Sequence, residues 1–167
     1  EKALPVPETG GGMLSPDGKR YVYTPIDREF RTWKRHRGGR AQDVWIYDLE
    51  ANDSRRLTNH VATDNQPTWI GDSIYFTSDR EYTLNLWRVG VAGGEPSKVT
   101  NFTEHDVLWP SAGPDAIVFE QNALLWLYQP ASNQLSQVRV ELSGDQPHRL
   151  PAFKNVAGQI DSLSLSP

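Results

Sequence analysis

A pattern that recurs about every 40 residues limits the folds open to this chain. A tryptophan in a short apolar run, followed by a turn-rich patch, occurs at Trp45, Trp87 and Trp126. After each patch comes a second short apolar run. A repeat of this length means that each unit is one supersecondary structure that buries its faces against its neighbours.

A second set of signals runs in phase with the tryptophans. Asp17-Gly18, Gly71-Asp72 and Gly113-Pro114-Asp115 precede runs rich in β-branched and aromatic residues. These are tight-turn sequences, in which glycine supplies a positive φ. Each unit therefore predicts strand, turn, strand, longer loop, strand, turn and strand. Four short strands in about 40 residues are typical of a β-propeller blade.

The predicted fold class is all-β, a β-propeller fragment of about three four-stranded blades plus flanking single strands. The expected boundaries are an outer strand of a preceding blade at 1–8, blades at about 12–60, 64–102 and 106–143, and the start of another blade at about 158–167. The first strands, near residues 66–70 and 107–111, would line the central pore. A fan of three blades leaves two apolar sheet faces uncovered. We therefore expect the remaining domains of a longer parent chain, or self-association, to cover them.

Composition excludes several classes of function. The net charge of −4 predicts no general attraction to nucleic acid or to an anionic membrane. No run of about 18 apolar residues is present, so no segment is expected to span a membrane. The chain has no cysteine, which excludes thiolate catalysis, disulfides and cysteine-based zinc sites.

One segment stands out as a candidate functional site. Residues 28–40 hold six Lys or Arg and one His against a single Glu, where a tight hairpin would suffice. Long loops on a propeller are often functional, and arginine suits bidentate carboxylate binding. Three interpretations stay open: docking to another domain or subunit, contact with a peptide substrate, or a solvated loop. The candidate residues are Arg28, Arg31, Trp33, Lys34, Arg35, His36, Arg37 and Arg40.

Nothing in the sequence predicts catalytic residues, a cofactor or a metal site. The histidines at positions 36, 60, 105 and 148 lack the spacing of metal ligands. No Gly-x-Ser-x-Gly motif is present. Ser162, Ser164 and Ser166 alternate without a nearby base. We therefore expect this part of the protein to be non-catalytic.

The stretch 23–49, together with Ser15-Pro16-Asp17-Gly18-Lys19-Arg20, resembles the N-terminal propeller region of the tricorn protease family. The resemblance implies a large, homo-oligomeric serine peptidase whose propellers filter and channel peptides. It also implies a PDZ-like domain and C-terminal catalytic domains. None of the catalytic segments falls in this chain, so the resemblance assigns no active-site residue here. It favours the cytoplasm, with the periplasm as the alternative.

Two other interpretations compete with the tricorn-like one. A TolB-like propeller would act as a protein-binding module in the bacterial envelope, and it shares the Ser-Pro-Asp-Gly turns. The basic segment distinguishes the two, because it is not expected in a TolB-like domain. The third interpretation is an enzyme whose site lies in the pore, and it lacks a convergent set of acid, base and nucleophile.

Overall fold

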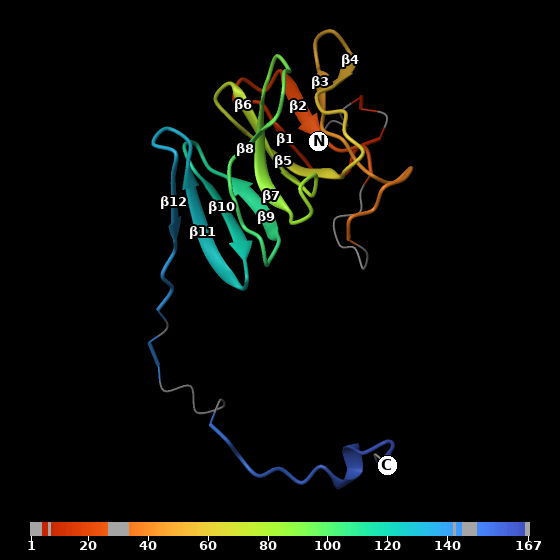
Figure 1. Ribbon diagram of the computed structural model, residues 1–167, viewed down its shortest axis with the longest axis vertical. Helices are drawn as coiled ribbons and strands as arrows, with labels where there is room; N and C mark the ends of the chain where they lie inside the picture. The colour runs from red at the N-terminus through yellow and green to blue at the C-terminus, as the bar shows by residue number, and fades with distance from the viewer. Residues whose placement is uncertain (1–4, 7, 27–33, 142, 145–149, 166–167) are drawn as a thin grey trace.

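The computed structural model describes residues 5–6, 8–26, 34–141, 143–144 and 150–165. It contains three four-stranded antiparallel sheets, shown in Figure 1. The first comprises β1 (Gly12–Leu14), β2 (Arg20–Tyr23), β3 (Trp45–Asp48) and β4 (Asp53–Arg56). The second comprises β5 (Asp64–Ile70), β6 (Ser73–Ser78), β7 (Asn85–Gly90) and β8 (Ser97–Lys98). The third comprises β9 (Val107–Ala112), β10 (Ile117–Gln121), β11 (Leu124–Gln129) and β12 (Gln134–Gln137).

Each sheet is a meander in which strands adjacent in sequence are adjacent in space. The first strands of the three sheets lie side by side, with β1 against β5 and β5 against β9. This arrangement confirms the predicted fold class, a propeller fragment of three four-stranded blades. The sheets twist and diverge from these first strands, as the blades of a propeller do.

The three recurring tryptophans occupy the same position in their sheets. Trp45 pairs with Arg56, Trp87 with Lys98 and Trp126 with Gln137. Their shared position in the repeat predicts that all three lie in the core. Trp45 departs from this prediction, whereas Trp126 packs against the buried residues between the second and third sheets. Trp87 is buried, but Trp45 and Trp126 are half-buried. Trp45 alternates with Ile46, which packs toward the second sheet, so Trp45 points to the side where the structure describes no sheet.

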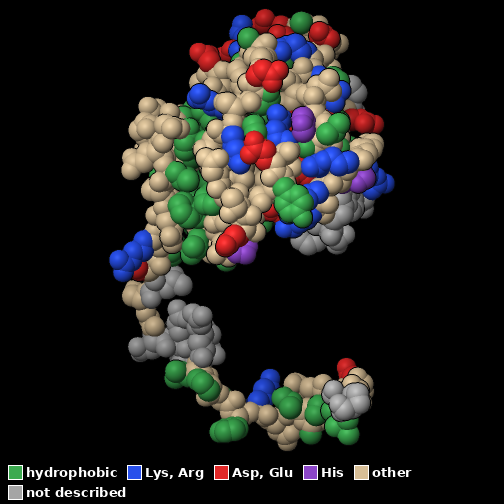
Figure 2. Space-filling view, in the orientation of Figure 1, with side chains coloured by type: hydrophobic (Ala, Val, Ile, Leu, Met, Phe, Trp, Pro, Cys, Tyr) green, Lys and Arg blue, Asp and Glu red, His purple; other side chains and the backbone are tan. Residues whose placement is uncertain are grey.

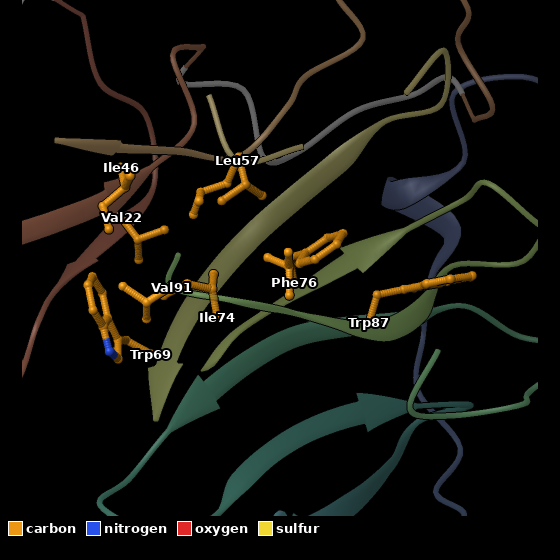
Figure 3. Packing of buried hydrophobic residues seen from close by; sticks show 10 residues of the cluster. Val22, Ile46, Leu57, Trp69, Ile74, Phe76, Trp87 and Val91 are labelled. Carbon is orange, nitrogen blue, oxygen red and sulfur yellow. The ribbon is translucent and has the colours of Figure 1, made fainter. Parts of the chain in front are cut away.

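The core consists of two clusters, one in each seam between sheets. The first joins Val22 and Ile46 of the first sheet to Ile74 and Phe76 of the second, as Figure 3 shows. The second lies on the opposite face of the second sheet, where Tyr75 meets residues of the third sheet. Alternation along β6 therefore places Tyr75 in one seam and its neighbours in the other. The middle sheet is buried on both faces.

Each of the first two sheets has a polar hydrogen-bond network at the equivalent corner. Asp43 accepts hydrogen bonds from Thr58 Oγ1 and the His60 N–H, at 3.3 and 3.2 Å. Asn85 does the same at the equivalent place, with Thr100 Oγ1 and the Phe102 N–H at 2.9 and 2.8 Å. In the first sheet the threonine oxygen in turn accepts the N–H of Val44, directly before β3, and in the second sheet it accepts that of Leu86 in β7. The network satisfies backbone groups where the outer strand ends.

The outer face of the third sheet is apolar and uncovered. Leu125, which is 43% exposed, lies on this face with the half-buried Val118 and Leu127, whereas the alternate residues Trp126 and Tyr128 face the second sheet. Apolar side chains gather over this sheet in Figure 2. The exposure follows from the open fan, since a blade at its end has no neighbour on one side.

The chain beyond β12 forms no sheet in the described residues. Ala157–Gln159 form a short 3-10 helix, while Leu163 and Leu165 are almost fully exposed. The strand expected at 158–167 stays a prediction, because a first strand needs the rest of its blade to pair with. The outer strand expected at 1–8 lies partly outside the described residues. Within the described part of the chain, no helix has the length and apolar character needed to cross a membrane.

Candidate functional site: a pocket beneath the basic segment

The described end of the basic segment, residues 34–41, crosses from the first sheet to the other two. We call it the strap. Three of its side chains contact the loop between β6 and β7 or the start of β9. The strap therefore connects all three sheets at the end where the first strands begin.

Lys34 contacts the start of the third sheet, the one most distant from the strap in sequence. Its Nζ lies 2.5 Å from Oδ2 of Asp106, which directly precedes β9 in the third sheet. The Asp106 side chain is only 7% exposed, and its other oxygen accepts a hydrogen bond from the Leu84 N–H at 3.1 Å. Lys34 thus neutralises a carboxylate held between the second and third sheets.

Arg35 stacks on an aromatic side chain. Its guanidinium carbon lies 3.6 Å from the centre of the Tyr82 ring, and its Nε donates to the Tyr82 carbonyl at 2.9 Å. Both residues have a positive φ, 55° for Arg35 and 82° for Tyr82. Such backbone conformations are costly for residues other than glycine. They persist only where the surrounding structure holds the backbone in place, as it does at this contact.

Arg37 makes the most buried of the three contacts. One of its terminal nitrogens donates to Oδ1 of Asp79 at 2.9 Å, and the other donates to the Asp79 carbonyl at 3.0 Å. Oδ1 of Asp79 also accepts from the Thr63 N–H at 3.0 Å. Because the Asp79 side chain is only 6% exposed, Arg37 compensates a buried charge.

A pocket of about 120 Å³ lies beneath the strap, in the seam between the second and third sheets. Its roof is Lys34, Arg35 and His36. The walls are Thr63, Asn65, Gln66, Thr77, Asp79, Tyr82, Leu84, Asp106, Leu108 and Trp109. All of these residues belong to the described part of the chain.

A wider groove of about 360 Å³ runs along the first strands of all three sheets. It is lined by Gly11, Gly12, Met13, Gln66, Pro67, Thr68, Trp109, Pro110, Ser111 and Ala112. Gln66 and Trp109 also line the pocket. These two side chains therefore stand between the groove and the pocket.

The positions of Gln66 and Trp109 depend on two equivalent bulges. Gln66 and Pro67 stand opposite Phe76, and Trp109 and Pro110 stand opposite Phe119. Gln66 and Trp109 have φ values of 50° and 53°. A bulge leaves one residue without a ladder partner, and proline has no N–H to lose. The bulges turn the side chains of Gln66 and Trp109 out of the regular alternation of their strands, and the Trp109 side chain is 48% exposed.

The structure brings together some of the residues predicted from the sequence. Lys34, Arg35 and His36 line the pocket, and Arg37 supports its Asp79 wall. Arg40 is exposed in the turn that follows. Arg28, Arg31 and Trp33 lie outside the described residues. Sequence reasoning missed Gln66, Tyr82 and Trp109, although Gln66-Pro67 and Trp109-Pro110 recur at one position of the repeat and could have signalled the bulges.

A buried ion pair lies in the second sheet. Arg80 donates to Oδ2 of Asp64 at 2.7 Å, and its guanidinium lies 4.7 Å from the Trp87 ring centre. The Asp64 side chain has no exposed surface. Burial raises the pKa of Asp64 above its ordinary value, although Ser78 and Arg80 oppose the rise. The packing of Arg80 against an aromatic ring indicates a structural role.

The described residues offer little to metal or nucleophilic chemistry. No group of three or more His, Asp or Glu side chains among them could hold a metal ion. Nδ1 of His60 accepts the Ala62 N–H at 3.0 Å, which occupies that nitrogen within its own loop. What the site offers is an apolar pocket with charged walls and a groove beside it, an arrangement suited to binding.

The fold and the groove define the class of the molecule as a segment of a β-propeller with a groove along its first strands. The family described as the tricorn protease N-terminal beta propeller domain matches residues 1–134. The chain belongs to this family.

Relatives of known sequence agree with the family assignment. The chain is 27% identical over 132 residues to a tricorn protease homolog of Saccharolobus solfataricus, a match that covers 77% of this chain and 12% of that protein. It is 30% identical over 129 residues to tricorn protease homolog 1 of Streptomyces coelicolor, covering 75% of this chain and 11% of that protein. The chain thus spans only about an eighth of the length of these relatives.

Solved structures show the same fold. The crystal structure of the tricorn protease matches with a TM-score of 0.68 and 20% identity, over 80% of this chain and 13% of that one. A putative TolB from Agrobacterium tumefaciens matches with a TM-score of 0.64 and 22% identity, over 80% of this chain and 50% of that one. At these identities the likeness shows the propeller architecture alone.

Proposed function

We propose that this segment is a non-catalytic part of a peptidase propeller, that it guides peptides along its first strands, and that it supports assembly of the parent protein. The observation that supports guidance most is the groove on β1, β5 and β9. The groove faces the side on which a closed ring has its channel. Because the chain belongs to the tricorn protease propeller family, peptides are the expected ligands of the groove.

The groove suits a passing chain better than a tightly held one. Pro67 and Pro110 have no N–H with which to bind a peptide backbone as an added strand. Contacts therefore come from side chains, which permits binding without long retention. The exposed apolar face of the third sheet supports the second role, because a further blade or subunit would remove Leu125 from water.

A blocking experiment tests the guidance role in the full-length protein. Ser111→Cys places a thiol in the groove, and Ser132→Cys places a matched thiol in the exposed turn between β11 and β12. Both are made in a background without other reactive cysteines and are labelled with a bulky maleimide. Hydrolysis of short chromogenic peptides and of longer peptides is then measured.

We expect the label at position 111 to slow hydrolysis of longer peptides several-fold, and the label at position 132 to leave it unchanged. Equal rates for both labelled proteins at every peptide length would overturn the guidance role. A TolB-like binding module would instead show no peptide hydrolysis and would retain a protein partner. Light scattering of the full-length protein, with and without a charged substitution at Leu125, tests the role in assembly.

A further inference from the structure

We propose that the pocket beneath the strap is a specificity subsite that accepts one aromatic side chain of a peptide lying in the groove, with acidic residues beside that side chain. The inference rests on the proposed function, because it assigns a substrate class to the same surface. The observations that support the subsite differ from those that support guidance, because they concern the pocket and the strap rather than the groove.

The connection between pocket and groove is the first step of the argument. Gln66 and Trp109 line both. A side chain that points sideways from a backbone in the groove therefore reaches the pocket at the edge that these two residues form. Because each bulge twists its strand, the opening lies where the regular ladder is interrupted.

The size and lining of the pocket select the kind of side chain. The volume of about 120 Å³ is close to that of cavities that hold a single benzene ring. Leu84 and Leu108 contribute apolar wall, and the half-exposed Trp109 offers a ring for edge or offset stacking. An alanine side chain would leave most of this volume unfilled.

The charges around the pocket select the neighbours of that side chain. Lys34 and Arg35 line the pocket, and Arg37 contacts its wall residue Asp79, so three cations stand against the two carboxylates of Asp79 and Asp106. Both carboxylates are buried and paired, Asp106 with Lys34 and Asp79 with Arg37, so the three cations exceed the two carboxylates by one positive charge. The net charge is therefore positive, and it complements acidic residues on either side of the inserted ring.

The strap holds the pocket in a form ready for binding. Arg35 is fixed by the Tyr82 ring and carbonyl, and Arg37 by the Asp79 side chain and carbonyl. These contacts join the strap to the loop between β6 and β7 in the second sheet. The position of the roof therefore does not depend on a bound ligand. A preformed pocket avoids the entropy of ordering a loop upon binding.

Photo-crosslinking in the full-length protein tests the proposal. The probe is an end-blocked pentapeptide, Gly-Glu-X-Glu-Gly, in which X is p-benzoylphenylalanine, added after a serine-directed inhibitor. Crosslinked positions are mapped by mass spectrometry. Competitors carry phenylalanine or alanine at X, and a third competitor has phenylalanine at X with lysine in place of both glutamates.

We expect crosslinks at Tyr82, Leu84, Leu108 or Trp109. The phenylalanine peptide should compete at least about tenfold better than the alanine peptide, in keeping with burial of an aromatic ring. It should also compete better than the lysine peptide, and added salt should narrow that second difference. Trp109→Ala should reduce the crosslink yield at least about fivefold, and Phe153→Ala, at an exposed aromatic outside the pocket, should leave it unchanged.

A second variant removes the pocket while keeping its aromatic wall. Leu84→Trp fills the volume, and it should lower the crosslink yield as Trp109→Ala does. Crosslinks that map elsewhere, or equal competition by the phenylalanine and alanine peptides, would overturn the proposal. If the label at position 111 still slows hydrolysis in that case, guidance along the groove stands and the specificity subsite alone fails. If the label has no effect, the proposed function fails first.

Discussion

The side-chain oxygen of Gln66 accepts a hydrogen bond at 3.3 Å from the backbone N–H of Trp109, the residue at the equivalent position of the next sheet. The bond joins two bulges in neighbouring first strands, each with a residue of positive φ. It therefore fixes the second and third sheets relative to each other at the edge of the pocket.

Removing this bond should loosen the seam. We expect Gln66→Ala to lower the free energy of local opening around β9 by about 1 kcal/mol, the usual loss for one hydrogen bond. Hydrogen exchange of peptides covering β9 in the intact protein measures the change. Gln129→Ala, on the exposed face of β11, is the control and should stay within about 0.5 kcal/mol. Unchanged exchange in β9 would contradict the prediction.

Asn85 supports the end of the second sheet through its side chain. It accepts from Thr100 and from the Phe102 N–H, and it donates to the carbonyls of Thr83 and Phe102. Asn85→Ala leaves these buried groups without partners and should destabilise β7 and β8 by about 2–3 kcal/mol.

The matched variant Asn85→Asp copies the residue that the first sheet has at position 43. It keeps the two accepting contacts and loses the two donating ones, so its loss of protection should be smaller than that of Asn85→Ala. Hydrogen exchange of β7 and β8 ranks the two variants. The opposite order would contradict the assigned role of the accepting oxygen.

The ion pair of Arg80 and Asp64 predicts a pH-dependent loss of stability. Arg80→Met leaves a buried carboxylate uncompensated, and we expect a loss of about 3–5 kcal/mol near neutral pH. The pKa of Asp64 is already raised by burial and should rise further in the variant. The folded state then binds a proton more readily than the unfolded state, so stability decreases as pH rises from the unfolded pKa through the folded one.

Thermal unfolding at pH 4.5 and pH 7.5 measures this effect. The deficit of Arg80→Met relative to the unmodified protein should be larger at pH 7.5. Arg88→Met, at an exposed position on β7, is the control and should show a small deficit that is equal at both values. A deficit independent of pH in the Arg80 variant would show that Asp64 stays ionised throughout.

The strap should open when its most buried contact is removed. Arg37→Gln leaves the Asp79 carboxylate without its cation, and we expect faster hydrogen exchange in residues 34–41 and 79–84, corresponding to about 1–3 kcal/mol. Arg40→Gln lies in the same segment at an exposed position and serves as the control. Equal exchange in the two variants would mean that charge alone, rather than the contact with Asp79, holds the strap.

The sequence predicted the strands well because their signals are local. Turn residues such as Asp17 act within a few positions, where Asp17 accepts from the Ser15 hydroxyl and the Lys19 N–H. The regular spacing of Trp45, Trp87 and Trp126 then placed four strands in each unit.

The pocket was not predictable in the same way, because its parts are distant in sequence. The basic segment was recognised, but its partners Asp79, Tyr82 and Asp106 lie in two other sheets. The chain shows no local sign that Arg35 stacks on Tyr82. The positive φ values of Gln66 and Trp109 likewise depend on bulges set by packing between sheets. Only the two recurring residue–proline pairs hint at them.

The contact between Lys34 and Asp106 also constrains the order in which the molecule can form during synthesis. The lysine leaves the ribosome with the first sheet, and its partner emerges after the second sheet is complete. The loop that holds the lysine can therefore make this contact only after the second sheet and the residues that lead into the third have been made. This contact therefore forms late in synthesis, once the chain has reached the start of the third blade, because its two partners lie far apart in the sequence.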